Sequence, residues 1–120
     1  MQINGKEMEL DIFDLATAER YEAAIDRVAV RMQEMQKQDL GFAEGIRAQC
    51  EAVAECFDAV FGPGTAAHIF DGEVNLKKSL SAFRELIDGA AAQQKDLMAM
   101  TAEVKAAYAP NRAARRAGSK

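Results

Sequence analysis

The chain has 120 residues, of which 49% are hydrophobic and 28% charged, and its formal net charge is −4. This length fits one domain, and the composition is that of an ordered globular protein rather than a disordered one. No apolar run approaches the roughly 20 residues that span a bilayer, and the first residues lack the pattern of a secretion signal, so we expect synthesis in the cytosol and no membrane segment.

Residues 1–13 predict a β-hairpin. Asn4-Gly5 suits a two-residue type I′ turn, whose central positions both need positive φ. With Ile3 opposite Lys6, the apolar residues share one face. Because an isolated hairpin is marginal in water, this one either packs on the chain's own helices or joins other copies. For the second alternative, the residues predicted to mediate oligomerisation are Ile3, Met8, Leu10 and Ile12.

A long first helix is predicted over residues 15–38, with Asp14 as its N-cap. Its apolar residues recur at intervals of three and four, as on one face of a helix. They are Tyr21, Ile25, Val28, Met32 and Met35.

A second helix is predicted over residues 42–61, and the Gly-Pro-Gly sequence at 62–64 should stop it. Thr65 is expected to cap a short helical turn over 66–70. The apolar face of the second helix consists of Phe42, Ile46, Cys50, Val53, Phe57 and Val60.

A third long helix is predicted over residues 76–107, with Asn75 as its N-cap. Gly89 and the Ala- and Gln-rich stretch after it predict a bend or break, since Gly lowers helix propensity by about 1 kcal/mol relative to Ala. Pro110 should end the helix by Tyr108. The expected core-facing residues are Leu76, Leu80, Phe83, Ile87 and Ala90, with Leu86 beside them, followed by Leu97, Met100 and Val104.

These elements predict a mainly α fold with three principal helices and a short N-terminal β-hairpin. We expect a single helical domain over 1–109, with the hairpin at 1–13 and the helices at 14–109, followed by a flexible basic tail at 110–120. Four of the 15 basic residues and none of the 19 acidic ones lie in that tail, so residues 1–109 carry a net charge of −8. A basic tail on an acidic body suits contact with a partner.

Few residues suggest chemistry. Cys50 and Cys56 lie about 240° apart on the predicted second helix, so they cannot bridge each other, and we expect two buried thiols. His68, the single histidine, is expected at the surface, which leaves no histidine cluster for a metal. We therefore predict no catalytic residues, no metal and no cofactor.

Three carboxylates share one face of the second helix at spacings of four and three residues. Such a ridge could hold a divalent cation or act as an acid and base, but a solvated acidic face is the commoner meaning of this pattern. The residues are Glu51, Glu55 and Asp58.

Nucleic acid is an unsuitable partner for this charge distribution. Only the tail is basic, it contains no aromatic residue, and the acidic body would repel phosphates. The composition of the tail alone indicates a solubilising terminus.

The C-terminal sequence Asn-Arg-Ala-Ala-Arg-Arg at 111–116 resembles the Asn-Arg-Ala-Gln-Arg-Arg type of ending seen on small tail proteins of long-tailed bacteriophages, with Ala114 where Gln is common. The layout agrees over most of the chain: an Asn-Gly hairpin, a helix carrying Glu-Arg-Tyr-Glu at 19–22, a Phe-Gly-Pro-Gly-Thr turn at 61–65 and Phe-Asp-Gly-Glu-Val-Asn-Leu at 70–76. The chain thus resembles the small tail assembly chaperones of siphophages and prophages.

This resemblance implies a non-enzymatic protein of the bacterial host's cytoplasm that binds the long, helical tape measure protein during tail assembly, as an oligomer. An alternative is another small phage-encoded helical protein that binds a host or virion protein. Flexible methionines suit a tolerant binding surface, although the same residues also suit a core. The expected partner-binding residues are Asn111, Arg112, Arg115, Arg116, Met98, Met100 and Val104.

Overall fold

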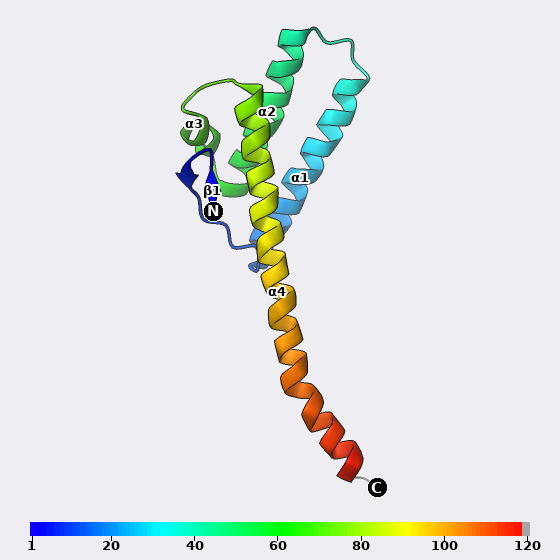
Figure 1. Cartoon of the computed structure of the whole chain (residues 1–120). Helices are drawn as coiled ribbons and strands as arrows, with labels where there is room; N and C mark the ends of the chain where they lie inside the picture. Colours follow the sequence, from blue (N-terminus) through cyan, green and yellow to red (C-terminus); the bar gives the residue numbers. More distant parts are fainter. Residues whose placement is uncertain (119–120) are drawn as a thin grey trace.

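The computed structural model describes the backbone of residues 1–118 and the side-chain surroundings of residues 1–108 (Figure 1). It confirms the prediction of a mainly α fold with three long helices and a short N-terminal hairpin. The elements in chain order are β1 (Gln2–Ile3), β2 (Lys6–Glu7), α1 (Leu15–Gln36), α2 (Phe42–Phe61), α3 (Thr65–Phe70) and α4 (Leu76–Gly118).

The hairpin has the predicted turn and register. Asn4 and Gly5 both have positive φ, and Ile3 pairs with Lys6. The hairpin packs on the chain's own helices: the side chain of Ile3 is fully buried in the core, and the backbone N–H of Asn4 donates to Glu85 Oε1 of α4 at 3.0 Å. This is the intrachain alternative of the two that the sequence left open.

The core forms where α2 meets α1, α3 and α4. Phe57 of α2 lies at its centre, with its ring stacked on Phe61 at a centroid distance of 6.1 Å and edge-on to Phe70 of α3 at 5.8 Å. Such aromatic pairs add about 0.5–1.5 kcal/mol beyond their buried area. The largest fully buried side chains are Phe57, Ile3, Ile69, Leu86 and Val53.

Two of the three predicted caps are confirmed. Asp14 accepts a hydrogen bond from the Thr17 backbone N–H at 3.1 Å, and Asn75 accepts one from that of Lys78 at 3.0 Å. The third prediction is wrong, because Thr65 is the first residue of α3 and donates its hydroxyl proton to the carbonyl of residue 62 instead.

Asp58 takes over the capping of α3. The N-cap position is occupied by Gly64 in the left-handed conformation, which has no side chain to accept a hydrogen bond. The carboxylate of Asp58, on the last turn of α2, accepts instead from the Ala66 backbone N–H at 2.9 Å. A cap from a neighbouring helix is invisible to local sequence patterns.

The long last helix is the largest departure from expectation. α4 continues through Gly89, so of the predicted bend or break the break is wrong. A side-chain carbon on Gly89 would lie 2.7 Å from Met1 Cε and 2.9 Å from Met1 Sδ, so this glycine provides room for the hairpin rather than a bend.

α4 also continues past Pro110 to Gly118, so the predicted end by Tyr108 is wrong as well. A proline within a helix removes one backbone hydrogen bond and tends to kink the helix, which costs stability but does not compel the helix to stop. The proposed division into a domain at 1–109 and a tail at 110–120 stays a prediction.

The face that α4 buries matches the predicted one only in part: Ala90 is buried and Phe83 packs against the core, as predicted. Leu80 and Ile87 were expected in the core but are 41% and 37% exposed. The residues of α4 that pack against the other elements are mostly small. Small side chains let α4 approach α2 closely where larger ones would not fit. The buried residues among them are Ser79, Ala82, Leu86 and Ala90.

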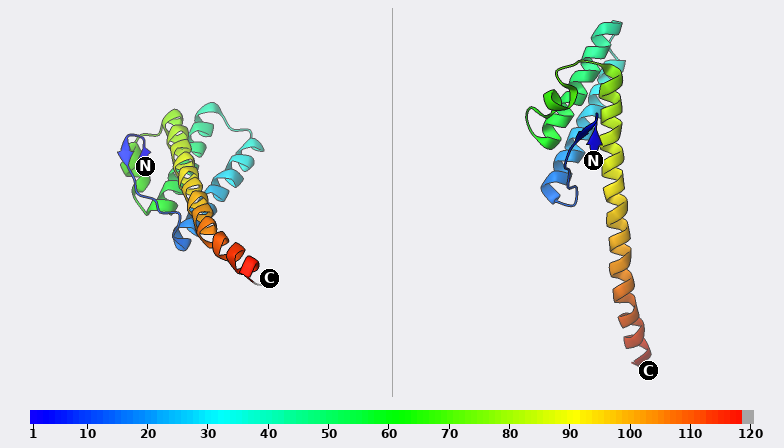
Figure 2. Two further views of the ribbon diagram at one scale, coloured as in Figure 1. Left: turned by 60° about the horizontal axis from the view of Figure 1, so that its bottom comes forward. Right: turned by 60° about the vertical axis from the view of Figure 1, so that its left-hand side comes forward.

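The molecule is strongly elongated, with principal extents of 74 × 32 × 22 Å. Its radius of gyration is 20.3 Å, against about 14 Å for a compact domain of this length. Figure 2 shows the cause: α4 continues alone well beyond the body formed by the other elements. Within the described residues, no helix combines the length and apolarity needed to cross a bilayer.

Candidate functional site

The most distinctive surface of the protein is an apolar row on the protruding part of α4. Leu97, Met100 and Val104 are 47%, 56% and 68% exposed. We call these three residues the distal stripe. At about 100° per residue they lie on the same helix face as Leu86 and Ala90, which are buried against the body two to three turns before Leu97. The distal stripe therefore continues the core-facing row of α4 beyond the body.

Gln93 marks the place where the body ends. Its side-chain oxygen accepts a hydrogen bond from the Ile12 backbone N–H at 3.0 Å, and its side-chain nitrogen donates to the Leu10 carbonyl. Two apolar residues close after Ile12 are exposed, Phe13 at 49% and Leu15 at 73%. Gln93 lies one turn before Leu97 on the same face, so the distal stripe begins beside this apolar edge of the body.

Charged residues flank the distal stripe unequally. Helical spacing places Asp96 and Glu103 along one side of it and Lys105 beyond the other side, and all three are exposed. The opposite face of the same turns includes the small residues Ala99 and Ala102 and, just before them, Lys95. An apolar row with charges beside it is the pattern by which helices recognise other helices.

Two of the three apolar residues predicted to bind a partner belong to this row. Met100 and Val104 lie in the distal stripe, whereas Met98 is rotated by about 120° from it and lies on the face of Leu80 and Ile87. Leu97 was absent from the predicted partner-binding residues. The signal that could have identified it is its spacing of four residues from Gln93 and three from Met100.

The side chains of the predicted basic contacts lie outside the described residues. The structure places the backbone of all four in α4, which runs to Gly118. These residues are Asn111, Arg112, Arg115 and Arg116.

The residues predicted to join copies serve contacts within the chain. Ile3 is fully buried, and Met8 and Leu10 pack against the same core. The backbone of Ile12 is bonded to Gln93. Oligomerisation through these four residues stays a prediction, but their intrachain packing disfavours it.

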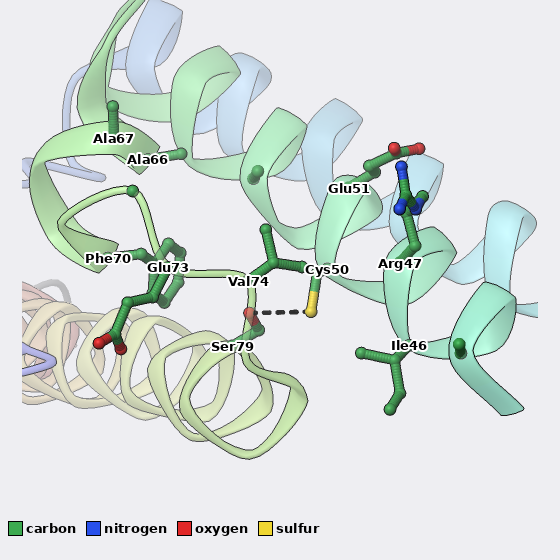
Figure 3. A pocket seen from close by; sticks show the side chains of 13 residues that line it. Ile46, Arg47, Cys50, Glu51, Ala66, Ala67, Phe70, Glu73, Val74 and Ser79 are labelled. Carbon is green, nitrogen blue, oxygen red and sulfur yellow. Dashed lines mark hydrogen bonds between the residues drawn. The ribbon is translucent and has the colours of Figure 1, made fainter.

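A groove of about 430 Å³ lies between α2, α3 and the start of α4 (Figure 3). Cys50 and Ser79 line it, and the Ser79 hydroxyl donates to Cys50 Sγ at 3.4 Å. Figure 3 shows Glu73 across the groove from Arg47 and Glu51. Apolar and small side chains make up most of the rest of the lining, so the groove presents shape and apolar surface rather than a set of convergent reactive groups.

Both cysteines are free and buried, as predicted. Burial raises the pKa of the Cys56 thiol to about 11, and the positive charge of Arg27 offsets this only in part. A thiol with such a pKa is protonated at neutral pH and is a poor nucleophile. His68 is exposed, as predicted, at the end of α3.

The three carboxylates of the predicted acidic ridge have different surroundings in the structure. Glu51 lines the groove, Glu55 forms an ion pair with Arg31 of α1 at 2.5 Å, and Asp58 caps α3. The prediction of a wholly solvated acidic face is therefore wrong at Asp58, whose side chain is half-buried and engaged. Over the residues that the structure describes, no group of three or more potential metal ligands gathers.

Comparison with known proteins places the chain in a family. Residues 4–119 match the family of unknown function DUF6673, and the protein belongs to that family. No curated protein matches the chain, and neither does any solved structure.

Proposed function

We propose that this protein is a non-enzymatic tail assembly chaperone of a long-tailed phage or prophage, and that it binds the tape measure protein through the distal stripe. The main support for the proposal is the exposure of Leu97, Met100 and Val104 on the part of α4 that projects beyond the body. An exposed apolar row of this kind suits a helical client, which can lay its own apolar face along it. The resemblance at residues 111–116 supplies the identity of the client.

The size of the distal stripe suits a contact that can be released. Because the three side chains are already about half covered, burying the rest of their surface contributes only about 3–5 kcal/mol, whereas association costs on the order of 4–15 kcal/mol in lost freedom. The distal stripe alone therefore gives weak binding, which the exposed side chains of Phe13 and Leu15 would strengthen. Reversible binding fits a protein that shields a client and then gives it up to the growing tail.

Co-expression with the tape measure protein of the same genome tests the proposal. We expect the wild-type protein to raise the soluble yield of that client and to co-purify with it. Met100→Gln with Val104→Gln removes apolar surface without changing the charge, and should abolish both effects. The matched control, Ala99→Gln with Ala102→Gln, makes a polar change on the opposite face of the same turns and should leave both effects intact.

An unchanged yield of the client with the wild-type protein would overturn the proposal. In that case a different host or virion protein that co-purifies through the distal stripe would favour the alternative of another small phage-encoded binding protein.

A further inference from the structure

We propose that the distal stripe of one copy is covered, before a client arrives, by the distal part of α4 from a second copy, with the two helices antiparallel. The pairing itself follows from the shape and charge of this chain. The further statement that this pairing covers the client-binding surface rests on the proposed function.

The length of the free helix fits an antiparallel pair. α4 leaves the body at Gln93 and ends at Gly118, so 25 residues after Gln93 project beyond it, a length of about 37 Å. In an antiparallel pair that overlaps fully, the end of each helix reaches the edge of the other copy's body. The two bodies then lie at opposite ends of the pair, where they do not collide.

A parallel pair is excluded by the position of the body. Leu86 and Ala90, which pack on the body, share a helix face with the distal stripe. If two distal stripes faced each other in parallel, both bodies would have to occupy the space between the two α4 helices just before Gln93. A parallel arrangement would also place two acidic bodies side by side.

The charge distribution favours the same antiparallel arrangement. Residues 110–120 carry four positive charges and no negative one, and residues 1–109 carry a net charge of −8. Asp96 lies beside the distal stripe, three residues after Gln93. Full antiparallel overlap brings the helix positions of Arg115 and Arg116 of each copy alongside Asp96 of the other copy, so unlike charges meet at both ends of the contact.

The pair should be weak. A helix contact about 37 Å long and about 12 Å wide buries on the order of 900 Å² in total over both copies, below the 1,200–2,000 Å² of stable complexes. We therefore expect a dimer whose population depends on protein concentration. A client with a longer apolar face can displace such a partner.

Sedimentation of the full chain over about 5–500 μM tests the pairing. The mass should rise from the 13.1 kDa of one chain towards twice that value. Met100→Gln with Val104→Gln should remain monomeric at every concentration, and the control Ala99→Gln with Ala102→Gln should dimerise as the wild type does. Raising the salt concentration should weaken dimerisation several-fold, because it screens the attraction between unlike charges. Deleting residues 110–120 should abolish dimerisation, because it removes most of the helix that faces the distal stripe of the other copy.

Cross-linking with a short bis-maleimide reagent tests the direction of the helices. Full antiparallel overlap centres on residue 106, so two copies of Val104→Cys lie close together and should cross-link. Two copies of Leu97→Cys lie about 27 Å apart along the axis and should not. The wild-type chain, whose own cysteines are buried, is the control for the reagent.

Three results would overturn the pairing: a single-chain mass at all concentrations, a dimer that survives the Met100→Gln and Val104→Gln changes, or equal cross-linking of both cysteine variants. None of these results bears on the co-expression test, so failure of the pairing and failure of the chaperone function can be told apart.

Discussion

Gln93 binds the backbone of Ile12: its side-chain oxygen accepts the Ile12 N–H at 3.0 Å, and its nitrogen donates to the carbonyl two residues earlier, at Leu10. One amide side chain thus satisfies two backbone groups of the segment that links the hairpin to α1. This contact ties the start of the chain to α4 and determines how much of that helix is left to protrude.

Gln93→Ala should lower the free energy of unfolding by about 1–3 kcal/mol, because it leaves two part-buried backbone groups without their partner. Urea denaturation followed by circular dichroism measures the change. Gln94→Ala alters an exposed neighbour of the same type and should shift the free energy by no more than about 0.5 kcal/mol. Equal effects of the two variants would mean that the Gln93 contacts contribute nothing to stability.

Ile3→Ala should lower the free energy of unfolding by about 2–5 kcal/mol, because the side chain is fully buried in the core. If Ile3 instead joined copies together, its replacement would reduce the mass of the assembly while the helices stayed equally stable. Thermal unfolding and sedimentation of the same sample separate the two roles. Glu9→Ala, at an exposed position near the hairpin, is the control.

Alkaline pH should destabilise the fold through Cys56. Burial raises its pKa from an ordinary 9.0 to about 11, so between these values the unfolded chain loses the thiol proton while the folded chain retains it. The stabilising contribution is complete below pH 9 and is lost as the pH rises to 11, by roughly 2 kcal/mol. Tyr21, whose pKa is also raised by burial, adds to the same trend.

Urea denaturation at pH 8 and at pH 10.5 measures this loss, and Cys56→Ala should reduce the difference between the two conditions. Because each variant is compared with itself at two pH values, any packing cost of the substitution cancels. An identical pH dependence in both proteins would show that Cys56 is not the group responsible.

Local sequence patterns predicted the elements well where a local cause determines them. The Asn4-Gly5 turn, the caps at Asp14 and Asn75 and both ends of α2 follow from residues that act within a few positions of themselves. Each has a dihedral preference or a side-chain hydrogen bond as its cause.

Contacts between distant segments account for the errors. Gly89 considered alone predicts a break in the helix, but in the structure Met1 fills the space beside it. The face that α4 buries depends on how closely α2 can approach the small side chains of Ser79 and Ala82, which no periodic pattern of large apolar residues reveals. The capping of α3 by Asp58 likewise joins two helices across a turn.

The candidate site was predicted only in part, again because contacts between distant segments determine which residues are exposed. Met100 and Val104 were predicted as partner contacts because they are surplus apolar residues on the distal part of the last helix, but the sequence could not tell whether they lie in the core or in solvent. The answer depends on Gln93 and Leu10, because the contact between them lies where the body stops.

Backbone hydrogen exchange along α4 tests the central claim most directly. Amides of residues 97–108 should exchange rapidly in the dilute protein, and the addition of an apolar helical segment of the tape measure protein should slow their exchange at least tenfold, as expected for burial of an exposed helix. Residues 20–36, the part of α1 beyond its exposed first turn, provide the internal control and should exchange at unchanged rates. Binding of the segment with no change at residues 97–108 would contradict the account, because the client would then be held elsewhere on the protein.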